Sequence, residues 1–303
     1  MMEESEVKVN SMKAWILAAR PKTLAGAAVP VMIGTAMALR DAAWHISAVP
    51  AVLCFLFAFI MQIDANFVND YFDFVRGNDD ETRLGPRRAC AQGWVTMRAM
   101  KSALVITTAL ACIAGLPLVL YGGMEMIFVG IVCVLFCFLY TTRLSYIGMG
   151  DILVIVFFGL VPVTMTYYLE MPRYMQSFTT DAIVASVACG LVVDALLIVN
   201  NYRDIDNDRK AGKTTLVVSL GPSRSRRLYL SLGIIACLMG GVLAFHGSVW
   251  AFVLPFVYLF FHVMTYRKMV KIDHGRELNR ILGETARNIF FYGLLVSIGL
   301  LLG

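Results

Sequence analysis

The longest stretch of this chain without a charged residue covers positions 228–266 and is apolar over most of its length. One transmembrane helix needs about 20 apolar residues, so this stretch is long enough for two helices with a break near Gly247. Further uncharged runs lie at 42–63, 102–124, 126–142, 152–169 and 288–303. Soluble globular chains carry charge on about a quarter of their residues. Here 16% of the residues are charged and 59% are hydrophobic, which excludes a soluble chain.

The hydropathy pattern predicts an all-α, polytopic membrane protein with nine transmembrane helices. Two less apolar segments, 15–39 and 182–202, join the clear runs to give this number. The helices are expected at 15–39, 46–69, 101–120, 125–142, 151–169, 182–202, 228–246, 249–266 and 285–302. Nine crossings would place the two ends of the chain on opposite sides of the membrane.

Basic residues are distributed very unevenly over the loops that these helices define. Of the 26 Lys and Arg residues, all except Arg40 and Arg173 fall in the N-terminal segment, in alternate loops or in the helix ends beside them. Loops rich in Lys and Arg stay on the cytoplasmic side of a membrane. The N-terminus and the loops 70–100, 143–150, 203–227 and 267–284 are therefore expected to be cytoplasmic, and the C-terminus to lie outside.

Two clusters of Asn and Asp residues occur at the predicted cytoplasmic ends of helices. The first is NFVNDYFDFVRGNDD at 66–80, and the second is NNYRDIDNDR at 200–209. Each follows an apolar helix without an intervening Gly or Pro, so we expect the helices to continue into the clusters. NDYFD at 69–73 resembles NNYRD at 200–204. This weak repeat suggests one domain over 1–303 with repeated halves at about 12–142 and 143–303.

Helical spacing places the polar residues of each cluster on a shared face. The two sets are Asn66, Asn69, Asp70 and Asp73, and Asn200, Asn201, Asp204 and Asp208. Carboxylates gathered in this way repel one another unless a cation lies between them. Mg²⁺ prefers oxygen ligands and completes its coordination shell with waters and substrate phosphates. The pattern favours a magnesium diphosphate site, although each cluster taken alone also fits a solvated, salt-bridged helix end.

Four further acidic residues lie in or at the ends of predicted membrane spans: Asp64, Asp151, Asp194 and Glu284. Charged groups in a membrane have a functional role by default, or they pair between helices. Asp64 and Asp194 each precede one of the two clusters, and we interpret them first as pairing residues. Tyr71, Phe72, Tyr140 and Tyr202 would lie near the cytoplasmic mouth. They fit cation–π shielding of a reactive cation and an interfacial aromatic belt equally well.

Several motifs of the chain resemble the UbiA superfamily of intramembrane aromatic prenyltransferases, and most closely its branch that prenylates 1,4-dihydroxy-2-naphthoate. The similar stretches cover about two thirds of the chain: ARPKTL at 19–24, NDYFDFVRG at 69–77, RLGPRR at 83–88, GDILVIVFFG at 150–159 and NNYRDIDNDRKAGKTTL at 200–216. Many members carry a third acidic residue where this chain has Gly77. Glycine there is common in the naphthoate branch, and the roles of Asp79 and Asp80 stay open.

The resemblance implies nine helices around a central cavity with Asp-rich cytoplasmic loops, in a bacterial inner membrane. It implies transfer of a polyprenyl group from its diphosphate to 1,4-dihydroxy-2-naphthoate, with release of pyrophosphate and CO₂ to give demethylmenaquinone. Two Mg²⁺ ions are expected, one bound by Asp70 and Asp73 and the other by Asp204 and Asp208. Lys22 and Asn66 complete the expected catalytic set. The expected diphosphate-binding residues are Lys22, Arg143, Arg203, Lys213, Asn69 and Asn200.

Two alternatives share part of this pattern. A sister prenyltransferase acting on another aromatic acceptor, such as 4-hydroxybenzoate or homogentisate, would use the same Asp residues. A secondary transporter would also have repeated halves and intramembrane charges, but its charges would lie near the membrane midplane. Neither prenyl chain length nor the residues that select the acceptor follow from the sequence. No obligate protein partner and no nucleic acid are expected.

Overall fold

The structure is a computed structural model that describes residues 7–77 and 83–303, without the side chain of Lys22. Helices are the only regular elements in this part of the chain. The α-helices are α1 Met12–Ala19, α2 Leu24–Asp41, α3 Ala48–Val75, α4 Met97–Gly115, α5 Val119–Gly122, α6 Glu125–Thr142, α7 Gly150–Ile155, α8 Val161–Glu170, α9 Thr180–Arg203, α10 Ile205–Lys210, α11 Leu216–Leu220, α12 Pro222–Phe245, α13 Val249–Val253, α14 Pro255–Ile272 and α15 Leu278–Leu301. The predicted all-α class is confirmed.

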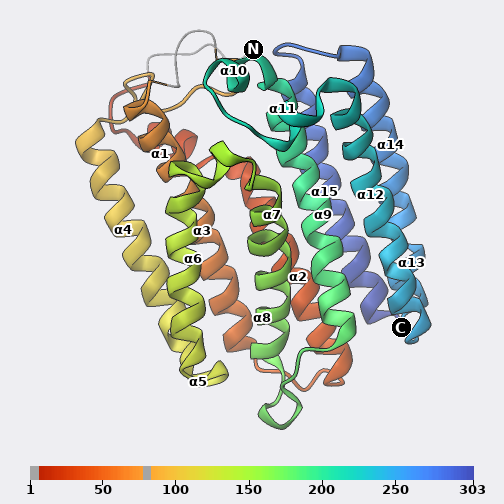
Figure 1. Cartoon of the computed structure of the whole chain (residues 1–303). Coiled ribbons are helices and arrows are strands. Elements are labelled where there is room, and N and C mark those ends of the chain that lie inside the picture. Colours follow the sequence, from red (N-terminus) through yellow and green to blue (C-terminus); the bar gives the residue numbers. More distant parts are fainter. Residues whose placement is uncertain (1–6, 78–82) are drawn as a thin grey trace.

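The long helices form one bundle and run side by side between two ends of the molecule (Figure 1). The most extensive packing joins α9 to α12, α2 to α15 and α3 to α4. The short helices α1, α10 and α11 lie together at the upper end in this view, whereas the C-terminus lies at the lower end. The loops that carry the predicted site therefore meet at one end of the bundle.

Eight segments of the described chain are long and apolar enough to cross a membrane. They are Leu24–Asp41, Ala48–Val75, Met97–Gly122, Glu125–Thr142, Gly150–Glu170, Thr180–Arg203, Pro222–Phe245 and Val249–Ile272. The predicted ninth span at 285–302 lies within α15 apart from its last residue, and α15 is not one of the eight. Arg280, Glu284, Arg287 and Asn288 lower the hydropathy of its first half. A multi-pass membrane protein is thus established, and the count of nine stays a prediction.

The first predicted helix, 15–39, is wrong as one continuous element. Arg20 adopts a left-handed conformation, with φ 51° and ψ 68°, and Pro21 starts a short 3₁₀ turn before α2. Proline lacks the N–H that would continue the hydrogen-bond ladder. The side chain of Asn66 holds the break in place, because its Nδ2 donates to the Ala19 carbonyl and to Thr23 Oγ1. Helix α1 thereby becomes part of the loop end of the bundle.

Close glycine contacts bring α9 against the segment that follows α7. A Cβ on Gly190 would lie 2.8 Å from the Ile155 carbonyl oxygen, and one on Gly159 would lie 2.5 Å from that of Ser186. Residues 156–160 form a π-helical turn between α7 and α8. π-Turns inside α-helices are often found at functional sites. The contact fixes the register between the first turn of α7 and the middle of α9.

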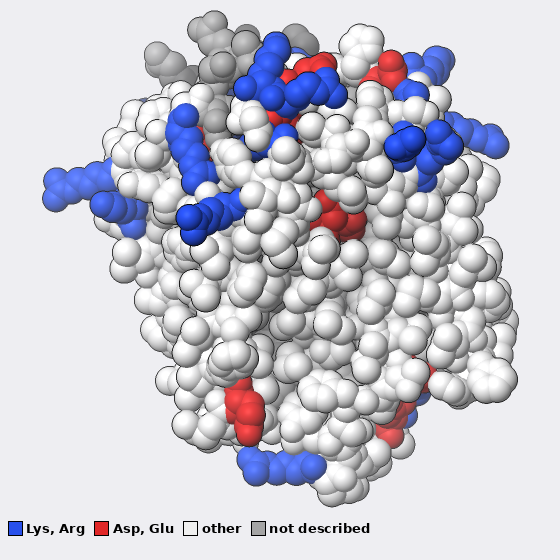
Figure 2. Space-filling model, viewed as in Figure 1, with Lys and Arg blue, Asp and Glu red and all other residues white. Residues whose placement is uncertain are grey.

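The charged side chains follow the predicted asymmetry. Lys and Arg cluster around the end of the molecule that carries α1, α10 and α11, and the broad middle of the visible face is almost uncharged (Figure 2). The two basic residues outside the predicted cytoplasmic set, Arg40 and Arg173, belong to α2 and to the loop after α8. This is the distribution expected for a bundle embedded in a bilayer with one basic face.

Candidate active site

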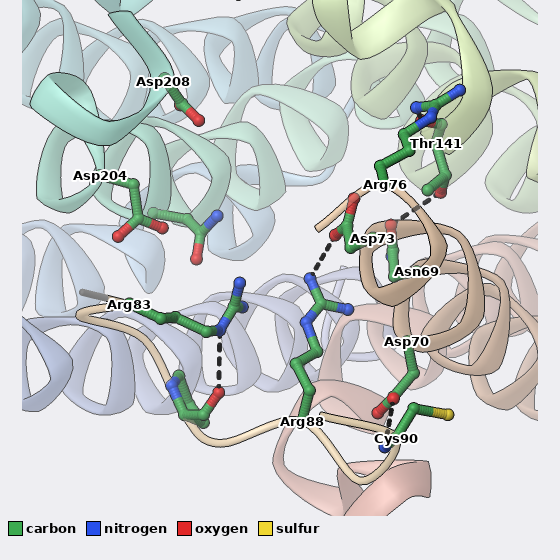
Figure 3. Close-up of polar contacts among 12 residues, drawn as sticks. Asn69, Asp70, Asp73, Arg76, Arg83, Arg88, Cys90, Thr141, Asp204 and Asp208 are labelled. Carbon is green, nitrogen blue, oxygen red and sulfur yellow. Dashed lines mark hydrogen bonds and ion pairs between the residues drawn. The ribbon is translucent and has the colours of Figure 1, made fainter. Parts of the chain in front are cut away.

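The first acidic segment lies on the last turns of α3, which continues through it to Val75, as predicted. Asp73 is 8% exposed, and Arg88 Nη2 donates to its Oδ2 at 2.7 Å. One turn earlier, Asn69 accepts a hydrogen bond from Thr141 Oγ1 at 2.7 Å. Asn69 and Asp73 thus lie on one face of α3, toward the loop residues that Figure 3 shows around them.

Asp70 makes different contacts from Asp73. Its carboxylate is fully buried and accepts hydrogen bonds from the backbone N–H groups of Ala89 and Cys90, at 2.9 and 2.8 Å. The Arg20 guanidinium lies 3.8 Å from the same carboxylate. Asp70 therefore anchors the 83–92 loop and the end of α1 to α3. Figure 3 shows it directed to Cys90 rather than to the gap beside Asp73.

The second acidic segment departs from the predicted continuous helix. Helix α9 ends at Arg203, Asp204 has φ −97° and ψ 10°, and α10 begins at Ile205. The Asp208 N–H still donates to the Asp204 carbonyl at 2.8 Å, so the two residues stay one turn apart. The break turns the exposed Asp206 outward and leaves Asp208 buried.

Arg203 is the centre of a hydrogen-bond network. Its guanidinium donates to both oxygens of Asp204, to Asn200 Oδ1 at 2.9 Å and to Asn279 Oδ1 at 2.8 Å. Asn279, on α15, donates in turn to the Leu84 carbonyl at 2.8 Å. Since the Arg203 side chain is 1% exposed and its donors are largely engaged, it acts here as a clamp between α9, α15 and the 83–88 loop.

Asp208 is paired with the Gly-Lys-Thr stretch that follows α10. Lys213 Nζ lies 3.4 Å from Asp208 Oδ1 and 5.0 Å from the centre of the Tyr146 ring. The Arg76 guanidinium lies 4.9 Å from the same ring, and it donates to the carbonyl oxygens of Thr141 and Thr142. Tyr146 therefore joins the end of α3 to the second acidic segment.

The two acidic segments face each other across Arg83 and Arg88 (Figure 3). Burial raises the pKa of Asp208 above its ordinary value, the carboxylates of Asp204 and Asp73 raise it further, and Lys213 opposes them. The charged form of Asp208 is therefore disfavoured in its surroundings, and an added cation would stabilise that form.

No group of three acidic, His or Cys side chains converges tightly enough to hold a metal within the described residues. Instead, each facing carboxylate has a basic partner: Arg88 for Asp73, Arg203 for Asp204 and Lys213 for Asp208. Each side of the gap offers only a few carboxylate ligands. This arrangement fits Mg²⁺, which keeps several waters and is bound by one or two carboxylates together with substrate phosphates. The donor set thus fits magnesium bound together with a diphosphate.

The structure brings some of the predicted site residues together and not others. Asn69, Asp73, Asn200, Asp204, Asp208 and Lys213 surround the gap or touch its carboxylates. Asn66 instead holds the α1–α2 break, and Arg143 is exposed at the end of α6. The side chain of Lys22, and Asp79 and Asp80, lie outside the described residues.

Sequence reasoning missed three partners of the site. Thr141, Tyr146 and Asn279 lie outside the two acidic segments, and each supports one of the motif residues. Only Tyr146 had a signal, as a tyrosine in a short basic loop beside a predicted helix end. Asn279 in particular has no neighbouring pattern that marks it.

The intramembrane acids separate into two types. Asp64 accepts hydrogen bonds from Thr107 and Thr108 of α4, and Glu284 contacts Lys268 and Thr265 of α14. For Asp64 these contacts confirm the interpretation as a residue that pairs between helices. For Asp194, which was interpreted in the same way, no such hydrogen bond or ion pair is found among the described residues. Asp151 and Asp194 are also buried, yet each has one carboxylate oxygen without a hydrogen-bond partner among the described residues.

A helical membrane bundle with two facing Asp clusters and several cations at one end defines a membrane protein built to bind a polyanionic substrate. The family model described as "UbiA prenyltransferase family" matches residues 27–295. The chain belongs to the UbiA prenyltransferase family.

Two relatives named for the same activity are 31% and 37% identical to this chain. The chain is 37% identical over 245 residues to a protein of Escherichia coli (strain K12) named 1,4-dihydroxy-2-naphthoate octaprenyltransferase, which covers 77% of this chain and 78% of that one. A Haemophilus influenzae protein of the same name is 31% identical over the full length of both. Among solved structures, a UbiA homologue from Archaeoglobus fulgidus bound to GPP and Mg²⁺ superposes with a TM-score of 0.63 at 15% identity, covering 94% of this chain and 99% of that one.

Proposed function

We propose that this protein transfers a polyprenyl group from a polyprenyl diphosphate to 1,4-dihydroxy-2-naphthoate and releases pyrophosphate and CO₂. The observation that carries the proposal is the convergence of Asp73, Asp204 and Asp208 around a gap lined by Arg83 and Arg88. This arrangement suits a diphosphate with divalent metal. The names of the relatives from E. coli and H. influenzae support the naphthoate acceptor.

Asp73, Asp204 and Asp208 are the proposed Mg²⁺ ligands, with Asn69 and Asn200 orienting them. We expect two ions, one for each acidic segment, and the A. fulgidus homologue supports binding of Mg²⁺ together with a prenyl diphosphate. Bound Mg²⁺ would stabilise the negative charge that develops on the departing pyrophosphate. Asp70 was expected to bind metal as well. Its backbone contacts favour a role in positioning the loop that presents Arg88.

Arg88 and Lys213 are the proposed diphosphate-binding cations. Each is paired with a carboxylate that would take up the metal, so either can turn to phosphate oxygens when that carboxylate binds Mg²⁺. Arg203 is already saturated by Asp204, Asn200 and Asn279 and is better suited to hold the second segment in place. Lys22 and Arg143 remain candidates from the sequence.

The apolar bundle below the gap would take the isoprenoid tail. Departure of pyrophosphate leaves an allylic cation, which must be kept from water until the ring attacks. Tyr140 and Tyr71 are half-buried near the loop end of α6 and α3, where aromatic faces stabilise a cation. Attack by the carboxyl-bearing ring carbon, followed by loss of CO₂, would give the prenylated hydroquinone.

We also propose that the loop end of the bundle is cytoplasmic and that the C-terminus lies outside, in a bacterial inner membrane. The enrichment of Lys and Arg at the loop end supports this orientation. Single cysteines introduced at Ala211 and at Leu302, in a chain with its seven native cysteines replaced, test it in intact cells. A membrane-impermeant maleimide should label the cysteine at 302 and not the one at 211, and the reverse result would contradict the proposal.

The catalytic proposal is tested with purified protein, Mg²⁺ and farnesyl diphosphate, offered 1,4-dihydroxy-2-naphthoate or 4-hydroxybenzoate. Mass spectrometry should show farnesyl addition with loss of CO₂ for the naphthoate. Product with 4-hydroxybenzoate alone would replace the acceptor and keep the reaction class. Absence of any product, together with no pyrophosphate release, would reject the proposed function.

A further inference from the structure

Asp151 and Asp194 form a buried acidic pair that the diphosphate site does not use. Asp151 lies in the first turn of α7 and is 6% exposed, and Asp194 lies in the middle of α9 and is 2% exposed. The start of α7 packs one turn from Asp194, because a Cβ on Gly150, next to Asp151, would lie 3.4 Å from Leu197 Cδ2. The close packing of α9 against residues 155–159 fixes the two helices in this register.

Both carboxylates lack the partners that a buried charge normally has. Asp151 Oδ1 and Asp194 Oδ1 are buried without a hydrogen-bond partner, and within the described residues no Lys or Arg forms an ion pair with either side chain. A buried polar atom left unpaired costs free energy. Two carboxylates brought close together in a membrane cannot both carry charge cheaply. A hydroxyl group of a ligand would satisfy the free oxygens.

The pair lies on the membrane side of the diphosphate site and is linked to it through Tyr140. A Cβ on Gly150, next to Asp151, would lie 3.7 Å from Tyr140 Oη. The next residue on α6, Thr141, donates a hydrogen bond to Asn69 of the first acidic segment at 2.7 Å. Asp194 precedes Asp204 by ten residues, about 15 Å along a helix. The pair therefore lies below the diphosphate site, on the membrane side where the prenyl chain and the ring that attacks it would lie.

We infer that Asp151 and Asp194 bind the ring hydroxyl of the aromatic acceptor and take its proton as the new carbon–carbon bond forms. This inference rests on the proposed function and adds the acceptor half of the site. The allylic carbon has already lost pyrophosphate, which leaves with the electron pair of the C–O bond. As the ring carbon bonds to it, the hydroxyl beside the carboxyl-bearing carbon becomes a carbonyl and its proton moves to the carboxylate. CO₂ then leaves, and the electrons of the broken carbon–carbon bond restore the aromatic ring. The protonated carboxyl of Asp151 or Asp194 returns the proton to the ring oxygen.

The decisive variant is the double substitution Asp151→Asn with Asp194→Asn, which keeps side-chain size and allows the two amides to hydrogen-bond each other. Two activities are measured: transfer to 1,4-dihydroxy-2-naphthoate, and Mg²⁺-dependent pyrophosphate release from geranyl diphosphate without acceptor. General acid–base groups contribute about 10²- to 10⁴-fold, so transfer should fall at least about 100-fold. Pyrophosphate release should stay within about threefold of the parent protein, because the diphosphate half is intact.

The matched control is Asp64→Asn, another buried carboxylate in a membrane span, whose oxygens are bonded by Thr107 and Thr108. It should keep both activities. Transfer at the parent rate in the double variant would overturn the inference, because the pair would then serve packing alone. Equal loss of pyrophosphate release would also overturn it, because the pair would then belong to the diphosphate half.

The single variants keep the test decisive if the double variant does not fold. At least one of Asp151→Asn and Asp194→Asn should lower kcat/KM for the acceptor at least about tenfold, without changing KM for the prenyl diphosphate. Parent values in both would overturn the inference. Transfer by the parent protein tests the proposed function separately from the inference. If it prenylates a different phenol, the same variants are tested with that phenol.

Discussion

Arg88 Nη2 donates a 2.7 Å hydrogen bond to Asp73 Oδ2, and both side chains are buried at the boundary between the 83–92 loop and α3. The guanidinium occupies the position of a counter-ion for a carboxylate that is proposed to bind Mg²⁺. The Arg88 guanidinium and Mg²⁺ would therefore compete for Asp73. A bound diphosphate would give the displaced Arg88 a new anionic partner. The site is consequently expected to bind metal and diphosphate together more strongly than either alone.

Replacing Arg88 with Met should destabilise the metal-free protein by about 3 kcal/mol, because it leaves Asp73 buried without its partner. Mg²⁺ should restore part of this loss by taking the place of the guanidinium. Prenyl transfer should fall at least about 100-fold. Thermal unfolding in detergent with and without Mg²⁺ measures the first effect. Arg98→Met, at an exposed position on α4, is the matched control and should change neither property. Equal stability of the two variants would contradict the role of Arg88.

Asp70 and Asp73 should respond differently to the same substitution, although the sequence pattern treats them as a pair. Asp70→Asn should cost about 1–3 kcal/mol of stability, because an amide has one acceptor oxygen for the N–H groups of Ala89 and Cys90. Its affinity for Mg²⁺ in the presence of diphosphate should stay within a few-fold. Asp73→Asn should lose Mg²⁺ affinity at least about tenfold. Calorimetric titration compares the two, and an equal loss of affinity would return Asp70 to the metal ligands.

The sequence predicted the helical membrane class and the two acidic segments because apolar runs and helical spacing are local properties. The continuation of α3 through its motif followed from the absence of Gly or Pro. The break at Asp204 did not, because it depends on Arg203 reaching Asn279 on α15, a contact over 76 positions. For the same reason, spacing alone grouped Asp70 with Asp73. Their partners, Cys90 and Arg88, lie in a loop whose fold no helical periodicity describes.

The raised pKa of Asp208 makes the stability of the metal-free protein depend on pH. A carboxyl whose pKa is higher in the folded than in the unfolded state destabilises the fold once it is ionised. Asp208→Asn should therefore stabilise the metal-free protein at neutral pH. The gain should shrink as the pH falls through the raised pKa, and it should vanish below the ordinary carboxyl range. Asp206→Asn, at an exposed position two residues away, should show no such dependence. A pH-independent gain in the Asp208 variant would contradict the assignment.

Because Gly85 has no side chain, the Arg203 guanidinium packs closely against the 83–88 loop. A Cβ at position 85 would lie 2.7 Å from Arg203 Nη2, so Gly85→Ala must displace the guanidinium from Asp204, Asn200 and Asn279. Because Asp204 would lose its position, prenyl transfer should fall at least about tenfold while the protein stays folded. Gly283→Ala, on α15 with open space around its Cβ, is the control. It should keep full activity and gain up to about 1 kcal/mol of stability from helix propensity. Full activity in Gly85→Ala would show that Arg203 does not position the second acidic segment.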